Sequence, residues 1–298
     1  MSAPGPGGGA ASGERAIAPP PDLRAQVLEA SRHRRAPGRP APDVPDISPA
    51  EAFSRRGHAF YTTLGGLDGG QWHRPVLRDL DVQGLVGHLI GVEEDMQRGL
   101  DGDAAVAHAD HVASTQPAAL RQAGRPPAET HAEWGRAAQQ TLARVRHAGD
   151  LDAIVTVYGL PLALGVWLVV RAFELWMHEN DIRGAAGLPA SVPDPATLRL
   201  MTDLVAGVLP LATAGAGLDQ AISLRLVLTG AGGGAWDVPV GGPVPGAAPM
   251  RIVTDAVGFC RLAANRCAPA DLDLDLDITG DPGLAALVLA AATTLGLD

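Results

Sequence analysis

The spacing of apolar residues changes near residue 217, and this change limits the folds open to the chain. Before that point, apolar residues recur at helical spacing between start and stop signals. After it, the segment 222–229 (ISLRLVLT) alternates apolar and polar residues, as a half-buried strand does. We therefore predict an α+β fold, in which a helical part precedes a small α+β domain.

The helical part carries unusually complete capping signals. Ser48 and Glu51 form a capping box with Pro49 at the first helical position, and Thr130 with Glu133 forms another. We read the polar, proline-bearing stretch 101–128 as a connection. Together with the apolar spacing, these signals predict four long helices and a fifth that leads out of them, at 49–64, 82–100, 130–148, 161–186 and 195–214. Four such helices joined by loops are typical of a four-helix bundle.

The C-terminal part is predicted to combine further short strands with two helices. The strands are expected at 236–240 and 250–254, and the helices at 255–266 and 281–296. The segment 271–278 (DLDLDLDI) has a strict period of two, which predicts a strand with one acidic face. Because alternating aspartates on a straight strand do not converge on one point, a solvated face is favoured over a calcium site.

These patterns divide the chain into three parts. Residues 1–47 form a proline- and glycine-rich extension with a short helix at 23–34. Residues 48–217 contain the bundle and its linker helix, and residues 218–298 form the small α+β domain. The uncharged run 153–170 leads directly into charged residues and is predicted to be a buried helix rather than a membrane span.

Charge and composition exclude several classes of partner. The formal net charge is −10 and no long basic run occurs, which argues against nucleic acid and an anionic membrane surface as partners. All 23 basic residues are arginine, so lysine Schiff-base chemistry is excluded. Cys260 and Cys267 would lie about 10 Å apart along a helix, too far for a disulfide, and are predicted to be buried core thiols. The absence of a disulfide framework and of an apolar leader predicts a cytoplasmic protein.

The segment around Glu174 and His178 is the most informative in the chain. These residues are four apart, so on a helix they are neighbours with a spacing that suits two ligands of one metal. Trp167, Arg171 and Asp181 fall on the same face. A buried polar stripe needs partners, which a metal supplies. The alternative is a salt-bridged surface face with a solvated histidine.

A second helix carries another metal-capable residue, His88, among apolar neighbours. Gly84 and Gly91 lie on its face, one turn to either side. They lower helix stability, which suggests that another backbone or a ligand approaches closely; the alternative is an ordinary core histidine. Two histidines and a glutamate would leave the fourth position of a zinc ion open, as catalysis requires. The histidines in polar stretches are predicted to be exposed, namely His73, His108, His111 and His131.

Two of these segments resemble the mycothiol-dependent maleylpyruvate isomerase family, within the DinB-like superfamily of helical bundles. The first is Asp81-Val-x-Gly-Leu-Val-x-His88-Leu-Ile-Gly, similar to the family's second-helix motif. The second, Val170-Arg-Ala-Phe-Glu174-Leu-Trp-Met-His178-Glu-Asn-Asp181-Ile-Arg, resembles its fourth-helix motif. The region after 218 is also similar, so the resemblance covers about 48–298.

The resemblance implies a DinB-like bundle with zinc, or another divalent metal, bound by His88, Glu174 and His178, and mycothiol as thiol cosubstrate. It implies either isomerisation, as from maleylpyruvate to fumarylpyruvate, or transfer of the thiol to a small electrophile. Arg171 is predicted to orient Glu174 or to hold a substrate carboxylate, and Asp181 to orient His178. The alternatives are a non-enzymatic metal- or ligand-binding protein and a zinc hydrolase.

Overall fold

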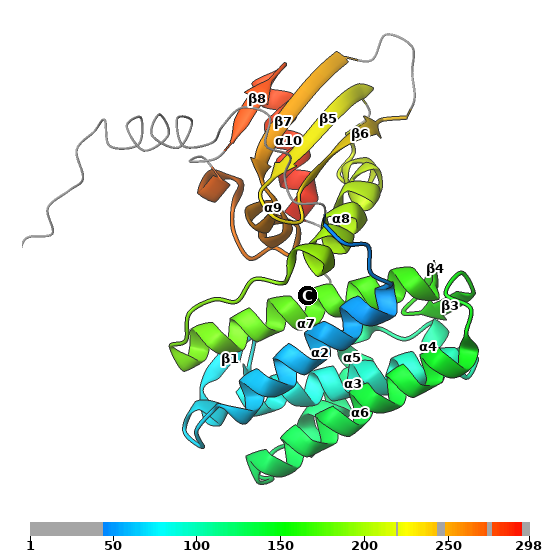
Figure 1. Cartoon of the computed structure of the whole chain (residues 1–298), viewed down its shortest axis with the longest axis vertical. Helices are drawn as coiled ribbons and strands as arrows, with labels where there is room; N and C mark the ends of the chain where they lie inside the picture. Colours follow the sequence, from blue (N-terminus) through cyan, green and yellow to red (C-terminus); the bar gives the residue numbers. More distant parts are fainter. Residues whose placement is uncertain (1–43, 219, 243–247, 273–275, 294–298) are drawn as a thin grey trace, which may run out of the picture. The chain divides into compact units, whose positions relative to one another are not determined.

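The computed structural model describes residues 44–218, 220–242, 248–272 and 276–293. Contacts between residues group Val44–Asp298 into one compact unit, separate from Met1–Asp43. The helix predicted at 23–34 lies outside the described residues. Within the unit, a helical region is followed by a four-stranded mixed sheet with helices, so the predicted α+β class is confirmed (Figure 1).

Four long helices pack together in the N-terminal region (Figure 1). They are α2 (Pro49–Gly65), α3 (Val82–Leu100), α6 (Pro127–Ala148) and α7 (Leu164–Ala186). Helix α2 begins where its capping box predicts, since the Glu51 N–H donates to the Ser48 hydroxyl at 3.1 Å. The link between α2 and α3 contains a 3₁₀ turn and a two-stranded sheet, η1 (Gln71–His73), β1 (Pro75–Leu77) and β2 (Leu80–Asp81).

Two predicted helix starts are wrong. Helix α6 begins at Pro127, upstream of the expected capping box, and the Thr130 hydroxyl donates instead to Gln122 Oε1 at 2.9 Å. Helix α7 begins at Leu164, because the first half of the uncharged run forms a hairpin of β3 (Ile154–Val157) and β4 (Leu160–Ala163). The two residues that join β3 to β4 both have positive φ, 52° at Tyr158 and 76° at Gly159. Positive φ at both positions is what a type I′ hairpin turn requires.

The stretch 101–128, read from the sequence as a connection, contains two helices, α4 (Ala104–Ala107) and α5 (His111–Arg121). Helix α5 packs closely on α3 because α3 carries glycine at the contact. A Cβ on Gly91 would lie 2.9 Å from the Cα of Thr115, and one on Gly87 would lie 2.7 Å from the Cα of Ala119. The predicted close approach is thus confirmed at Gly91, where it brings α5 against the helix that carries His88. It is not found at Gly84, where the atoms nearest to an added Cβ are those of the Leu80 and Asp81 side chains.

Substituting alanine for Gly87 is expected to lower the free energy of unfolding by about 1–3 kcal/mol, because the added methyl group meets the α5 backbone. The matched control is Gly207→Ala, on an exposed helix position with nothing within 4 Å of the new Cβ. There the free energy of unfolding should rise by up to about 1 kcal/mol, from helix propensity alone. Urea unfolding of both variants tests this, and equal changes would contradict the close packing of α5 on α3.

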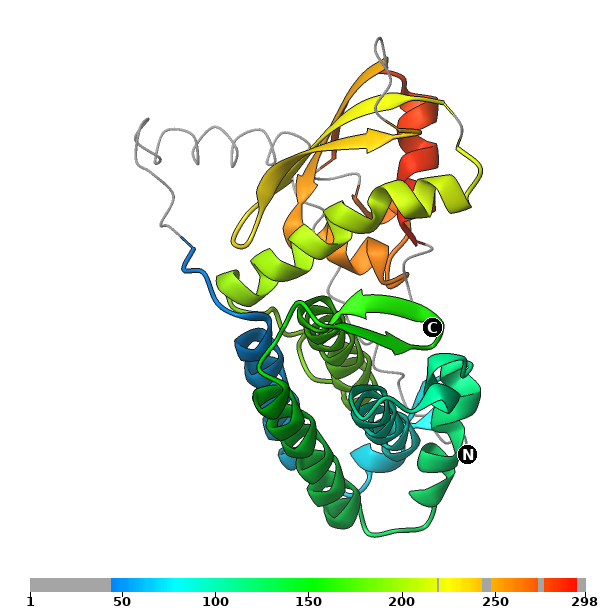
Figure 2. The same ribbon diagram turned by 90° about the vertical axis from the view of Figure 1, so that its right-hand side faces the viewer.

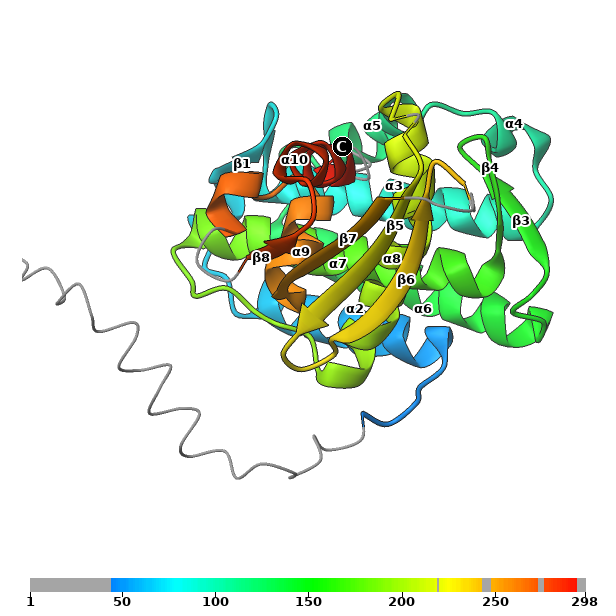
Figure 3. The same cartoon turned by 90° about the horizontal axis from the view of Figure 1, so that it is seen from above.

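The C-terminal sheet has the strand order β6-β5-β7-β8 (Figure 3). Strands β5 and β7 are parallel, and the two outer pairs are antiparallel. The strands are β5 (Ile222–Thr229), β6 (Gly234–Val240), β7 (Ala248–Asp255) and β8 (Asp277–Thr279). One face of the sheet is covered by α8 (Pro195–Gly215), α9 (Ala256–Ala263) and α10 (Pro282–Ala292) (Figure 2).

Helix α8 is long and apolar enough to cross a membrane, judged by length and composition alone. In this structure, the apolar side chains of α8 pack against the C-terminal sheet. Leu198, Met201 and Val205 are buried in the same core as the inward side chains of the sheet, such as Leu224 and Ile252. The helix therefore packs as a core element of this fold.

The acidic strand predicted at 271–278 is wrong over most of its described length. Asp271 lies in a 3₁₀ turn, η2 (Pro269–Leu272), where its carboxylate accepts a hydrogen bond from the Ala268 N–H at 2.7 Å. Such local side-chain bonds compete with strand formation. Residues 273–275 lie outside the described residues, and β8 begins only at Asp277.

The two cysteines are both free, as predicted. Cys260 is a fully buried core thiol, and burial raises its pKa above the ordinary value. Cys267 is only half-buried, so the core prediction is correct for the first cysteine and too strong for the second.

Helix α7 contributes apolar side chains to two cores. Leu168 and Leu175 belong to the core of the helical bundle. Ala172 and Trp176 belong to the core shared with the C-terminal sheet. A helix that is apolar on most sides is expected in the interior of a fold, and α7 holds this position. The polar side chains that it carries are consequently held in a fixed, water-poor setting.

Candidate functional site

The three predicted donor residues converge in the interior of the bundle. Glu174 and His178 lie one turn apart on α7, and His88 reaches them from α3. Glu174 Oε1 is 3.7 Å from His88 Nε2 and 4.0 Å from His178 Nε2. One donor atom from each residue lies within 4.8 Å of the other two. Neighbouring ligands of a tetrahedral zinc ion are about 3.4 Å apart, so the three atoms are close to the spacing that a metal ion requires.

The three donor residues are buried, so their donor atoms need a partner inside the protein. His88 is 2% exposed, Glu174 9% and His178 0%. Within the described residues, neither His88 Nε2 nor Glu174 Oε1 has a hydrogen-bond partner. Buried polar atoms without a partner are costly, and a cation between them would satisfy both. The chain thus contains a buried His/Glu/His set able to hold a metal ion.

The outer nitrogen of each imidazole is held by a supporting residue. His88 Nδ1 lies 2.8 Å from the Thr115 hydroxyl, which itself donates to the His111 carbonyl at 2.9 Å. Because that hydroxyl proton is already used, the imidazole Nδ1–H donates to the threonine oxygen. His178 Nδ1 likewise lies 3.0 Å from Asp181 Oδ2. Both Nε2 lone pairs are therefore directed inward, as in a metal-ligating histidine.

Asp181 is fixed in turn by a residue of the C-terminal part. Arg266 donates to Asp181 Oδ1 and Oδ2 at 2.9 Å each, through Nε and Nη2. Burial alone raises the pKa of Asp181, but hydrogen bonds from His178 and Arg266 hold it below its ordinary value. The sequence prediction that Asp181 orients His178 agrees with this contact, whereas Arg266 was not predicted.

Arg171 lies behind the glutamate rather than in an open substrate position. Its guanidinium contacts Glu174 Oε2 and donates to Glu93 Oε1 at 2.9 Å, and the side chain is 1% exposed. Burial by itself raises the pKa of Glu174, but Arg171 and the surrounding imidazoles hold it well below the ordinary value. Glu174 is consequently a carboxylate at neutral pH. Of the two roles predicted for Arg171, these contacts favour orienting Glu174.

His88 is electrically suited to bind a cation. Burial lowers the pKa of His88 below its ordinary value, against the raising effect of the Glu174 carboxylate. His88 is therefore neutral near pH 7, with a lone pair available. A neutral imidazole and an ionised carboxylate are the protonation states that metal binding needs.

A further imidazole, His111, also faces Glu174. Its Nε2 is buried, lies 3.9 Å from Glu174 Oε1, and has no hydrogen-bond partner among the described residues. Its ring is 5.1 Å from that of His88 and 4.6 Å from that of Tyr158. The prediction that His111 is exposed is wrong, because the segment read as a connection forms α5 and begins at this residue. His73 and His108 are exposed as predicted, and His131 is half-buried.

Replacing Thr115 with valine is expected to weaken zinc binding about 10- to 100-fold, the usual cost of losing a group that orients a ligand. Valine keeps the shape but removes the oxygen that accepts from His88 Nδ1. The control is Thr213→Val, since Thr213 is buried and bonds only to carbonyls of its own helix. Competition with a chromophoric chelator measures both affinities. An equal affinity in the two variants would contradict a supporting role for Thr115.

The unpredicted residues left little signal in the sequence. Thr115 and His111 lie on a helix of 11 residues with an internal proline, so helical spacing is barely visible there. Glu93 was the better clue, as a charged residue within the apolar pattern of the His88 helix. Its burial and its ion pair with Arg171 explain its place in that pattern.

Comparison with known proteins agrees with this geometry. Residues 53–183 match the family model described as the mycothiol maleylpyruvate isomerase N-terminal domain. The matched part of the chain contains His88, Glu174 and His178. No curated protein sequence matches the chain.

Two solved structures are similar to the chain over a longer span. One is a crystal structure of the mycothiol-dependent maleylpyruvate isomerase, with a TM-score of 0.53 and 13% identity over 78% of this chain and 91% of that one. The other is a histidine-to-alanine mutant of that enzyme, with a TM-score of 0.52 and 14% identity over the same shares. At such low identity the likeness establishes the fold.

Proposed function

We propose that this chain is a zinc-dependent enzyme that activates a low-molecular-weight thiol, mycothiol, for reaction with a small electrophile. The observation that carries the proposal is the buried set of His88, Glu174 and His178, whose donor atoms lie within 4.8 Å of one another. The match of residues 53–183 to the mycothiol maleylpyruvate isomerase N-terminal domain model supports the choice of thiol.

The donor set favours zinc in a catalytic role. Two imidazoles and one carboxylate are a common protein contribution to catalytic zinc, with the fourth position left for a reactant. When bound, the metal ion supplies positive charge that favours the thiolate over the thiol, and the thiolate is the nucleophile. His88 and His178 would hold the ion through Nε2, and Glu174 through Oε1.

The surrounding residues orient the donors. Thr115 and Asp181 fix the two imidazole rings, while Arg171 fixes the carboxylate. His111 offers one more buried nitrogen beside the donors, able to form a hydrogen bond to a bound reactant.

Two cavities reach Glu174, which suits an enzyme with two reactants. One, of about 270 Å³, is lined by apolar residues such as Val92 and Trp167 and by the polar residues Asp110, His111, Tyr158 and Arg171. The other, of about 370 Å³, is mainly apolar and also reaches His178. A thiol and an electrophile held in the two cavities would meet beside Glu174.

The test is incubation of the zinc-loaded full chain with mycothiol and a panel of electrophiles that includes maleylpyruvate, with products identified by mass spectrometry. We expect an isomerised product if the thiol adds and leaves again, or a thiol adduct if it stays. Glu174→Gln is the control and should form neither. A wild-type chain that holds zinc but converts no electrophile would contradict the proposal and leave a non-enzymatic metal-binding protein.

A further inference from the structure

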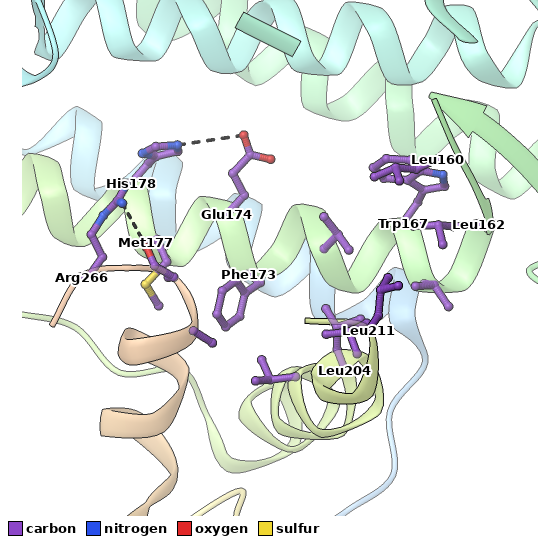
Figure 4. A pocket seen from close by; sticks show the side chains of 16 residues that line it. Leu160, Leu162, Trp167, Phe173, Glu174, Met177, His178, Leu204, Leu211 and Arg266 are labelled. Carbon is purple, nitrogen blue, oxygen red and sulfur yellow. Dashed lines mark hydrogen bonds and ion pairs between the residues drawn. The ribbon is translucent and has the colours of Figure 1, made fainter. Parts of the chain in front are cut away.

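The larger cavity has walls of one chemical character. It is a cleft of about 370 Å³ between α7 and α8, with Leu160 and Leu162 of β4 at one end (Figure 4). This volume is within the range of small-molecule sites, about 300–1,000 Å³. Its walls are aliphatic and aromatic, with Val166, Val170 and Phe173 on α7 facing Leu204, Val208 and Leu211 on α8.

The mouth of the cleft is apolar as well. Leu160 is 40% exposed, Val166 36% and Leu211 73%. All three line the cleft, so these exposed apolar side chains are gathered in one place instead of being scattered singly over the surface. Contiguous exposed apolar surface of this kind marks ligand-binding grooves.

Part of the candidate metal site borders the cleft. Glu174 and His178 are among its lining residues, and Figure 4 shows their side chains on one side of α7 while Phe173 points toward α8 from another. A molecule lying along the apolar walls would therefore lie beside these two donors. This continuity connects the cleft with the proposed chemistry and distinguishes it from an ordinary packing defect.

The charges near the cleft are already neutralised. Among the described residues that line it, Arg266 is the one arginine, and both oxygens of Asp181 hold its guanidinium. Arg171, next to the donors, is paired with Glu93 and Glu174. A ligand with two carboxylates would have to break one of these ion pairs to be neutralised, at a high desolvation cost.

We propose that the cleft binds the apolar body of the electrophile, and that the substrate is an α,β-unsaturated aldehyde or ketone with an alkyl or aryl substituent rather than a dicarboxylate. This inference rests on the proposed function. The sulfur of the thiol forms a bond to the β-carbon while the carbon–carbon π bond breaks, and the thiol proton ends on the α-carbon. No oxidant or reductant is needed.

The first test measures binding without any thiol. Unreactive 2-ketones from 2-pentanone to 2-nonanone are titrated calorimetrically into the zinc-loaded full chain, with succinate as the dicarboxylate probe. We expect affinity to rise about 4-fold per methylene, equal to about 0.8 kcal/mol, and succinate not to bind. Affinity that is independent of ketone length, or that favours succinate, would overturn the inference.

Variants at the mouth of the cleft test whether the ketones bind there. Val166→Asp and Leu211→Asp place a charge at partly exposed positions of the cleft and should remove most of the dependence on chain length. Leu287→Asp is the matched control, because Leu287 is 54% exposed on α10 and does not line the cleft. If all three variants lose the dependence of affinity on ketone length equally, the assignment of ketone binding to the cleft would be overturned. A wild-type dimer that Leu211→Asp converts to monomer would also overturn it, since the occupant would then be a second copy.

The second test separates this inference from the proposed function. Turnover with mycothiol is compared between trans-2-alkenals of increasing length and maleylpyruvate. Preference for maleylpyruvate with no ketone binding would overturn the apolar substrate and leave the proposed function standing. Ketone binding without turnover of any electrophile would overturn the proposed function while supporting the cleft as an apolar ligand site.

Discussion

Replacing Glu174 with glutamine is expected to lower the affinity for zinc by more than about 100-fold, beyond the range seen when only a supporting residue is lost. Glutamine has nearly the same shape, but it removes the negative charge that the two imidazoles face at 3.7 and 4.0 Å. The measurement is metal content after purification, together with a competition titration against a chromophoric chelator. Glu129→Gln is the control, because Glu129 is exposed on α6 and makes no contact with the site.

The same assay applied to the histidines tests the whole donor set. His88→Ala, and the double replacement of Glu174 and His178 by alanine, should remove bound metal while the helical circular-dichroism signal stays. The bundle core around these residues consists of apolar side chains that the variants leave in place. Full retention of metal in every variant would remove the assignment of the site.

Replacing Glu179 with alanine is expected to lower the free energy of unfolding by about 3–5 kcal/mol, since it leaves a buried guanidinium without its counter-charge. Glu179 is 2% exposed and its partner Arg56, from α2, is 5% exposed. Glu179 also accepts from the Thr63 hydroxyl at 2.9 Å. Urea unfolding followed by circular dichroism measures the change.

A neighbouring exposed ion pair provides the control for this prediction. Arg55 and Glu51 lie 2.9 Å apart on the surface of the same helix, with side chains 40% and 51% exposed. Replacing Glu51 with alanine should lower the free energy of unfolding by less than about 1 kcal/mol. The double variant Arg56→Met, Glu179→Leu should recover most of the loss, because it leaves no buried charge. If Glu179→Ala lowers the free energy of unfolding no more than Glu51→Ala does, the prediction that burial strengthens the effect of removing the carboxylate is contradicted.

Sequence patterns predicted the elements whose signals are local. The strand at 222–229 was predicted with its observed bounds, and α2 begins at its capping box. Two of the missed elements lacked a clear local signal. Helix α5 is stabilised by close packing against Gly87 and Gly91, which are distant in sequence. The hairpin at 154–163 turns at Tyr158 and Gly159 with positive φ, and a tyrosine is not a usual residue in that conformation.

The residues of the candidate site also divide into those with a local sequence signal and those without one. The spacing of Glu174 and His178 on one helix is a local signal. His88 was predicted from its apolar setting on another helix, and the family resemblance implied that the three bind one metal. The residues that complete the surroundings come from elements whose positions no local pattern fixes. His111 and Thr115 come from α5, and Arg266 follows α9 in the C-terminal part. Tertiary packing alone brings these side chains to the donors.

The position of α7 between two cores has a consequence for the architecture of the whole unit. The helix that carries two of the three donors is a wall common to both halves, with Leu175 facing one interior and Trp176 the other. The link from Arg266 through Asp181 to His178 crosses this wall. The C-terminal half is thus a structural component of the donor site, and a chain cut after the bundle would lose both the cover of α7 and the alignment of one imidazole.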